Sequence, residues 1–215
     1  MNMKDNSGIL TVVSGFSGSG KGTVMKLLLS KYSDYSLSVS VTTRSPRPGE
    51  VDGREYFFRT REEFERLIAD GELLEYAKYV DNYYGTPCFY VEEQLKAGRD
   101  VILEIEMQGA MQVKKRFPEA VLVFVTPPSM EELEKRLKGR GTEEDDVIAG
   151  RLRQAAAEAD VMRQYDYILI NENDRAEECA DQLHSIIRCE HLRAARNGRF
   201  IESLRQATMK GASDQ

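Results

Sequence analysis

The stretch ILTVVSGFSGSGKGTVMKLLL, residues 9–29, decides how this chain is expected to fold. Its first six residues are mostly apolar and rich in β-branched side chains, which is typical of a strand buried on both faces. Its last seven place apolar residues on one broad face of a helix. Between them lies a glycine-rich loop that contains Lys21. The stretch therefore predicts a strand, a phosphate-binding loop and a helix in direct succession.

The composition of this loop suits the phosphates of a nucleoside triphosphate. Its glycines allow positive φ angles, so that the backbone N–H groups can turn around an anion. The helix N-terminus adds partial positive charge, and the ammonium of Lys21 can reach the β- and γ-phosphates. A glycine turn that merely joins strand to helix is disfavoured, because strand, lysine and helix are all in place. The expected ATP-binding residues are Gly15, Phe16, Ser17, Gly18, Ser19, Gly20, Lys21, Gly22 and Thr23.

The position after Lys21 departs from the general phosphate-loop pattern. That pattern has Ser or Thr there, as a ligand of Mg²⁺, whereas this chain has Gly22 and carries the hydroxyl one residue later, at Thr23. We therefore expect Mg²⁺ to be held by phosphates, water and a carboxylate, with Thr23 contributing mostly through water.

The rest of the chain extends the first strand and helix into an α/β fold. Further apolar runs at residues 101–105, 121–125 and 167–170 predict buried parallel strands. Helical patterns cover residues 23–32, 129–139 and 174–196, and the last two open with Ser129-x-x-Glu132 and Asp174-x-x-Glu177 as capping boxes. Alternating strands and helices predict a parallel sheet with right-handed crossovers.

Two stretches interrupt this alternation. Residues 41–92 are rich in Tyr, Thr, Arg and Gly, with one helix at 60–70 opened by Thr60-x-x-Glu63, and predict a small mixed β lobe. Residues 129–160 form two charged helical stretches joined around Arg140 and predict a helical lid. The core is then discontinuous, comprising residues 7–40, 93–128 and 161–207. The tail at residues 209–215 is expected to be disordered.

Charge and cysteine content limit the partners. The formal net charge is -6, so the chain as a whole does not attract nucleic acid or an anionic membrane surface. No apolar run approaches the ~20 residues of a membrane helix. Three cysteines without a C-x-x-C pair disfavour a disulfide framework or a zinc site and suit a cytoplasmic protein. A homo-oligomer is compatible with the sequence.

Arg44 and Arg47 stand on a loop that Pro46 and Pro48 stiffen. Two guanidinium groups three residues apart suit a dianionic phosphate, although an isolated pair of arginines is more often a solvated turn. Tyrosines, Glu75 and Thr86 lie in the same predicted lobe. Together these residues indicate a second nucleotide pocket beside the phosphate loop.

Across residues 7–196 the sequence resembles the guanylate kinases. The resemblance rests on SVTTRSPRPGE at residues 40–50, LLEYA at 73–77, NYYGT at 82–86, LEIEMQG at 103–109, PPS at 127–129 and GRGTE at 139–143. It implies a P-loop NTPase fold with a parallel sheet core, an inserted mixed β lobe that binds GMP, and a helical lid. It also implies transfer of a phosphoryl group from ATP to GMP in purine nucleotide metabolism, with Mg²⁺ as cofactor.

The resemblance assigns roles to residues that match the family's motifs. Ser40 and Glu75 read the guanine, whose N1–H and N2–H₂ donors a carboxylate can accept. Asn171 lies near the adenine. Glu104 is the first choice for orienting water on Mg²⁺, and Glu106 stands where the family more often has Asp. The full implied sets are Ser40, Arg44, Arg47, Tyr56, Glu75, Tyr84, Thr86 and Glu104 for GMP, and Lys21, Arg44, Arg136, Arg140 and Arg151 for catalysis.

A different role for Arg136 and three other functions for the whole chain have to be weighed against these assignments. Arg136 could instead pair with Glu132 at i,i+4 on a solvated helix. A non-catalytic scaffold domain of the same fold would lack the loop lysine or the lid arginines, and both are present. A kinase for another base conflicts with the Ser40 and Glu75 pair. A regulatory GTPase would need an N-K-x-D sequence, which the chain does not contain.

Overall fold

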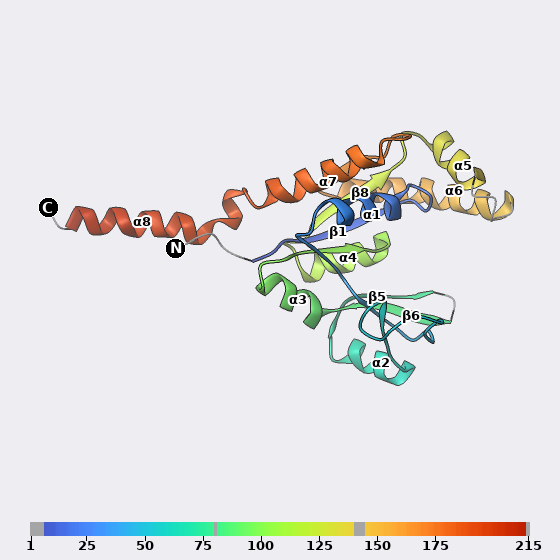
Figure 1. The fold of residues 1–215 in the computed structure, drawn as a ribbon, viewed down its shortest axis with the longest axis horizontal. Helices are drawn as coiled ribbons and strands as arrows, with labels where there is room; N and C mark the ends of the chain where they lie inside the picture. The colour runs from blue at the N-terminus through green and yellow to red at the C-terminus, as the bar shows by residue number, and fades with distance from the viewer. Residues whose placement is uncertain (1–6, 80, 140–144, 214–215) are drawn as a thin grey trace.

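The computed structural model describes residues 7–79, 81–139 and 145–213, which form two sheets with helices packed around them (Figure 1). The strands are β1 (Leu10–Gly15), β2 (Tyr35–Leu37), β3 (Ser40–Thr42), β4 (Tyr56–Phe58), β5 (Leu73–Tyr79), β6 (Asn82–Pro87), β7 (Asp100–Glu104), β8 (Val121–Thr126) and β9 (Tyr167–Ile170). The α-helices are α1 (Lys21–Lys31), α2 (Arg61–Ala69), α3 (Cys88–Lys96), α4 (Met107–Arg116), α5 (Met130–Gly139), α6 (Asp145–Ala159), α7 (Ala176–Glu190) and α8 (Gly198–Ser213). Two 3₁₀ turns, η1 (Asp160–Gln164) and η2 (Ala194–Arg196), complete the elements.

The larger sheet is parallel throughout, in the order β2-β7-β1-β8-β9. β1 lies at its centre, so that Val12 is opposite Leu103 on one side and Leu122 on the other. All six residues of β1 are buried, as expected for a strand covered on both faces. The parallel core predicted from the sequence is confirmed.

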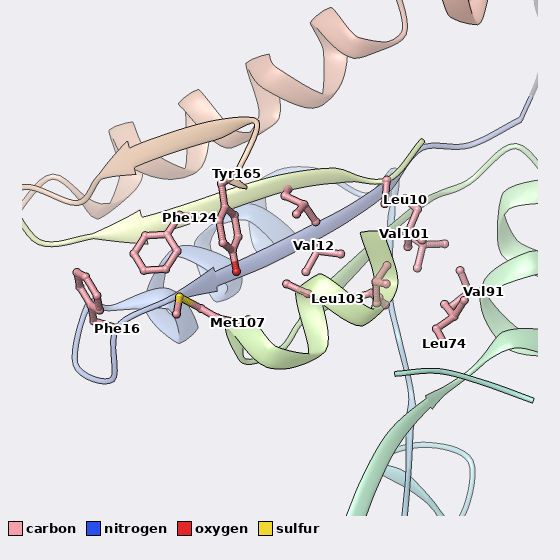
Figure 2. Packing of buried hydrophobic residues seen from close by; sticks show 14 of the residues in the cluster. Leu10, Val12, Phe16, Leu74, Val91, Val101, Leu103, Met107, Phe124 and Tyr165 are labelled. Atoms are coloured by element: carbon pink, nitrogen blue, oxygen red, sulfur yellow. The ribbon is translucent and has the colours of Figure 1, made fainter. Parts of the chain in front are cut away.

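Helices cover both faces of this sheet. On one face α1 and α7 pack over Val13, Val123 and Leu169. On the other, α3, α4, α5 and α6 enclose a larger core, in which Phe16, Phe124 and Tyr165 stack edge to face beside Met107 (Figure 2). The ring centroids of Phe16 and Phe124 are 5.0 Å apart. This aromatic cluster supports the turn that follows β1.

The smaller sheet is mixed, in the order β4-β3-β6-β5, with β3 parallel to β4 and antiparallel to β6. Leu74 of β5 joins the larger core together with Val91 (Figure 2). From the other side, the amide of Gln112 on α4 makes two hydrogen bonds with the backbone of Tyr76, of 3.2 and 3.1 Å. These contacts hold the mixed sheet against α4. The inserted mixed lobe of the predicted fold is confirmed, whereas the exact boundaries 7–40, 41–92, 93–128, 129–160 and 161–207 stay predictions.

Helix ends show where local sequence signals succeed and fail. The capping box of α2 is confirmed, because Thr60 and Glu63 each accept a hydrogen bond from the other's backbone N–H. At α5, Ser129 Oγ accepts the N–H of Glu132. At α7 the predicted cap is wrong: the helix begins at Ala176, and Asp174 adopts a left-handed φ of 57°, outside the helix. Its side chain therefore cannot act as the N-cap.

The predicted helix at 174–196 is also wrong at its end. α7 stops at Glu190, η2 follows, and α8 continues to Ser213, so the expected disorder from residue 209 is wrong for residues 209–213. α8 projects beyond α7, away from both sheets (Figure 1). Within the described ranges, no helix is both long and apolar enough to cross a membrane.

Candidate active site

The glycine-rich loop joins β1 to α1 at the carboxyl edge of the parallel sheet. Gly18 and Gly20 have φ angles of 94° and 91°, in the left-handed region that side chains disfavour. A Cβ on Gly20 would also lie only 2.4 Å from Nδ2 of Asn171. Gly20 immediately precedes α1, so the first N–H groups of the helix face the loop. This geometry matches what an anion cradle requires, and the phosphate-binding role of the loop stays a prediction.

Two side chains from distant elements brace the loop. The carbonyl oxygen of Ser19 accepts hydrogen bonds from Asn171 Nδ2 at 2.8 Å and from Arg136 Nη1 at 3.2 Å. Arg136 also donates to the Asn171 carbonyl at 2.8 Å and to Asn173 Oδ1 at 2.6 Å. Its Nε–Glu132 contact of 3.2 Å is the alternative i,i+4 pair. Arg136 therefore makes the local pair and the loop contacts together.

Arg151 of α6 reaches the same loop, where its guanidinium donates to the hydroxyl of Ser17. Phe16 points into the core, so only its backbone is available to a phosphate. Arg140 lies outside the described residues. Of the three predicted lid arginines, Arg136 and Arg151 are thus placed at the phosphate loop.

Lys21 begins α1 and folds back over the loop. Its ammonium donates to the carbonyl oxygens of Gly15 at 2.6 Å and Phe16 at 3.2 Å. The surrounding protein desolvates the carboxylate of Glu104 and raises its pKa, the positive charge of Lys21 partly offsets this, and Glu106 raises the pKa further. The charges of Lys21 and of the two glutamates at and just after the end of β7 are therefore close enough to act on one another.

The residues near Lys21 fit a magnesium ion that arrives with the triphosphate. Oε1 of Glu104 lies 3.9 Å from the position that a Cβ on Gly22 would occupy, and the exposed Thr23 hydroxyl is the next residue along α1. Carboxylate, hydroxyl and water oxygens are the ligands that Mg²⁺ prefers. In the described part of the chain no three His, Cys, Asp or Glu side chains converge on one metal position. The donor set therefore suits an ion held largely by phosphates and water.

The mixed sheet gathers a second set of polar side chains. Because β3 lies between β4 and β6, Ser40 is opposite Tyr56, and the rings of Tyr56 and Tyr84 are 6.1 Å apart. The guanidinium of Arg44 lies over the Tyr56 ring at 5.3 Å. Arg44, Tyr56 and Tyr84 are therefore brought together as predicted for a phosphate group, and Ser40 lies beside them on the strand; the roles of all four stay predictions.

Arg44 is held by a residue for which the sequence suggested no role. Its Nη2 donates to Glu50 Oε1 at 2.9 Å, and Glu50 Oε2 accepts the backbone N–H of Arg47 at 2.7 Å. These hydrogen bonds lower the pKa of Glu50, and the Glu50 contact raises the pKa of Arg44. Arg47 itself is exposed. The Pro-Gly turn before Glu50 returns the chain toward Arg44, and this was the signal available in the sequence.

Glu75 and Thr86 are a buried pair on adjacent strands. They are opposite one another on β5 and β6, and Thr86 Oγ1 donates to Glu75 Oε1 at 2.7 Å. Burial raises the pKa of Glu75, and the hydrogen bond from Thr86 partly offsets this. Glu75 is only 6% exposed. A negative charge on its carboxylate therefore costs free energy unless enough hydrogen-bond donors surround it. Such a group is suited to accepting hydrogen bonds from a ligand.

Gly109, in the first turn of α4, is a second residue to which the sequence assigned no role. A Cβ at this position would lie 2.8 Å from Glu75 Oε2 and 3.3 Å from Glu75 Cδ. The Gly109 backbone therefore leaves the space in which the Glu75 carboxylate lies. Only two residues separate the end of β7 at Glu104 from the start of α4 at Met107, so Glu104 and Gly109, which contacts Glu75, lie close together in the chain.

The comparisons with known proteins agree with this arrangement. The family model described as guanylate kinase matches residues 7–190. A guanylate kinase of Oceanobacillus iheyensis is 53% identical over 194 residues, covering 90% of this chain and 93% of that protein. One of Streptococcus thermophilus is 55% identical over 191 residues, covering 88% and 90%. The crystal structure of guanylate kinase from Anaplasma phagocytophilum superposes with a TM-score of 0.71 at 36% identity, covering 94% of this chain and 96% of that one. The phosphate loop, the parallel core and the inserted mixed sheet thus occur together in a chain that belongs to the guanylate kinase family.

Proposed function

We propose that the protein transfers the γ-phosphoryl group of ATP to GMP, giving ADP and GDP for GTP supply in purine nucleotide metabolism. The observation that carries this proposal is the buried Glu75 carboxylate, held by Thr86 and given its space by Gly109. Guanine presents two adjacent donors, N1–H and N2–H₂, that a carboxylate can accept together. Adenine has no such pair and would leave Glu75 desolvated and unpaired.

On the donor side, the loop from Gly15 to Thr23 binds the ATP phosphates and Lys21 neutralises the β/γ region. To do so the ammonium exchanges its carbonyl partners at Gly15 and Phe16 for phosphate oxygens. Arg136 and Arg151, already in contact with loop residues, add positive charge as it develops on the transferred group. Arg140 belongs to the same proposed set, and Asn171, braced on Ser19, lies near the adenine.

On the acceptor side, Arg44, Tyr56 and Tyr84 hold the GMP phosphate, with Arg47 beside them, and Ser40 contributes to the base. Glu50 orients the guanidinium of Arg44 through the hydrogen bond from Nη2 to Oε1. The two guanidinium groups screen the acceptor phosphate, which would otherwise repel the γ-phosphate. Phosphoryl transfer through a loose transition state depends on positioning and charge stabilisation rather than on a strong base.

Mg²⁺ fits this site as the cofactor, with Glu104 and Thr23 holding it mostly through water. When bound, it supplies neutralisation of the triphosphate charge. We also propose a cytoplasmic location, because the three cysteines are free thiols, which suit a reducing compartment.

The test of the proposed function is the rate of ADP formation from ATP with GMP, AMP, UMP or CMP as acceptor. We expect kcat/KM for GMP to exceed that for AMP by at least about 100-fold, because only guanine satisfies Glu75. Equal turnover of AMP and GMP would contradict the assignment of guanine.

Gly109→Ala should weaken the binding of GMP and leave the binding of ATP unchanged. The new Cβ would displace the Glu75 carboxylate, and we expect the KM for GMP to rise about 10-fold while the KM for ATP is unchanged. Alanine is intrinsically favoured over glycine in a helix by about 1 kcal/mol, so general destabilisation is not the expected cause. Gly150→Ala on α6 is the matched control, since its Cβ would meet nothing within 4 Å. A change in both KM values, or in neither, would contradict this role of Gly109.

A further inference from the structure

The strand that carries the Glu75 carboxylate, β5, is positioned only weakly by its own sheet. β5 comes last in the order β4-β3-β6-β5, so that β6 is the one described strand that pairs with it. The pairing is also irregular, because its register shifts between Leu73 and Glu75. An irregularity of this kind bends a strand and changes the direction of its side chains. The ladder between β5 and β6 is therefore least regular directly before Glu75.

The burial of Glu75 adds a force that opposes its position. Thr86 is the one described residue that donates a hydrogen bond to this carboxylate, at 2.7 Å. A carboxylate that is almost fully buried has lost its hydration, and its charge favours any shift of β5 that lets water reach it. Contacts from outside the mixed sheet are therefore needed to hold β5 in place.

Helix α4 supplies such contacts, since it lies between the parallel sheet and β5 (Figure 1). Oε1 of Gln112 accepts the backbone N–H of Tyr76 at 3.2 Å, and Nε2 of Gln112 donates to the carbonyl oxygen of Tyr76 at 3.1 Å. In a regular antiparallel sheet, a residue of the next strand would exchange the same two bonds with Tyr76. The Gln112 amide thus takes the place of a neighbouring strand at the residue that follows Glu75.

A second side chain of α4 holds the other end of the irregular segment. Nη1 of Arg116 donates to the carbonyl oxygen of Leu73 at 2.9 Å, and Nη2 donates to the carbonyl oxygen of Gly71. Gly109, Gln112 and Arg116 are spaced by three and four residues, so they lie on one face of the helix. This face of α4 therefore contacts β5 on both sides of the buried carboxylate and leaves it space at Gly109.

We propose that Gln112 is a positioning residue for guanine recognition, which holds β5 so that the Glu75 carboxylate stays buried where the base has to meet it. This inference rests on the proposed function, because Gln112 acts on the nucleotide only through Glu75. Both polar atoms of its amide are already used by the backbone of Tyr76. Guanine then meets a carboxylate that is in place before binding, and less binding free energy is lost in ordering it.

The test is a double-mutant cycle, in which GMP is titrated calorimetrically into the wild type, Gln112→Met, Glu75→Gln and the double variant. Methionine is a flexible side chain that can fill the same space, but it offers no N–H donor and only a weak acceptor, so both bonds to Tyr76 are lost. Gln112→Met should raise the dissociation constant for GMP about 10-fold when Glu75 is present, and less than about 2-fold in the Glu75→Gln background. The affinity for ATP should be the same in all four proteins.

Lys115→Met is the matched control, because Lys115 is an exposed residue of the same helix. It should leave the dissociation constant for GMP unchanged. The protein without nucleotide offers a second readout, which is hydrogen exchange at the backbone amide of Tyr76. This amide should exchange at least about 10-fold faster in Gln112→Met, while the amides of the parallel sheet keep their protection.

An equal rise in the dissociation constant in both Glu75 backgrounds would overturn the proposal, because Gln112 would then act on the whole lobe rather than on the carboxylate. Unchanged GMP affinity in Gln112→Met, or unchanged exchange at Tyr76, would also overturn it. Failure of the proposed function gives a different result, in which the wild type itself binds GMP no more tightly than AMP. That outcome would remove both proposals together.

Discussion

Lys21→Ala should lower kcat for phosphoryl transfer by at least about 1,000-fold. The substitution removes the only loop side chain whose positive charge lies against the Gly15 and Phe16 carbonyls, where the β/γ-phosphates are expected. GMP affinity should change little, because Glu75 and Thr86 belong to the other sheet and Arg44 lies in the loop that follows its strand β3. The measurements are single-turnover kinetics for the first effect and calorimetric titration with GMP for the second.

Lys26→Ala is the matched control for this variant. Lys26 lies on the same helix, α1, but is exposed on its surface. It should leave kcat and both affinities near the wild-type values. If Lys21→Ala abolished GMP binding along with transfer, the two nucleotides would not occupy separate pockets, and the proposed site would be wrong.

Glu75→Gln should raise the KM for GMP about 10- to 100-fold and leave the KM for ATP nearly unchanged. A hydrogen bond to a charged group contributes about 1.5–3 kcal/mol, and glutamine presents one acceptor and one amide donor to the two guanine donors. The amide oxygen can still accept the Thr86 hydroxyl, so the mixed sheet keeps its internal contact. Discrimination against AMP should fall in parallel. An unchanged KM for GMP would remove Glu75 from the base-binding site.

The same variant should be more stable than the wild type without nucleotide. Burial raises the pKa of Glu75 in the folded state above its unfolded value. Between these two values the folded state binds more protons than the unfolded state, so the stability of the protein falls as pH rises through this range. Glu75→Gln should therefore melt at a higher temperature than wild type at pH 7, and the difference should shrink as pH falls toward the unfolded pKa. A lower melting temperature at pH 7 would show that Glu75 stabilises the unliganded fold.

Local patterns predicted the regular elements most accurately where one short segment contained the whole signal. The strand–loop–helix unit around Lys21 and the strand at Tyr167–Ile170 were found from the order of apolar and glycine residues. The capping box at Thr60 was found because its two partners are three residues apart. The start of α7 was missed because Asp174 takes a left-handed conformation that an Asp-x-x-Glu pattern does not reveal.

The candidate site was harder to predict than the helices and strands, because it is built from contacts between segments that are distant in the sequence. Arg136 matched two hypotheses, and the sequence could not show that it meets Glu132, Ser19 and Asn171 at once. Gly109 looked like an ordinary helix residue, since its importance arises from a carboxylate 34 positions away in the chain. Such contacts depend on which faces of the elements pack together.

The sequence by itself determined the chemistry available to this protein: a glycine-rich loop with a lysine for phosphates, and arginines, tyrosines and a glutamate for a second nucleotide. These are properties of residue type and short spacing, which backbone sterics and charge express locally. Only the tertiary structure decided that Gly109 makes room for Glu75, that Glu50 holds Arg44, and that α8 stands clear of its own chain. The reason is physical, because hydrogen bonds and close packing act over a few ångströms and join residues that only the packing of the two sheets and α4 brings that near.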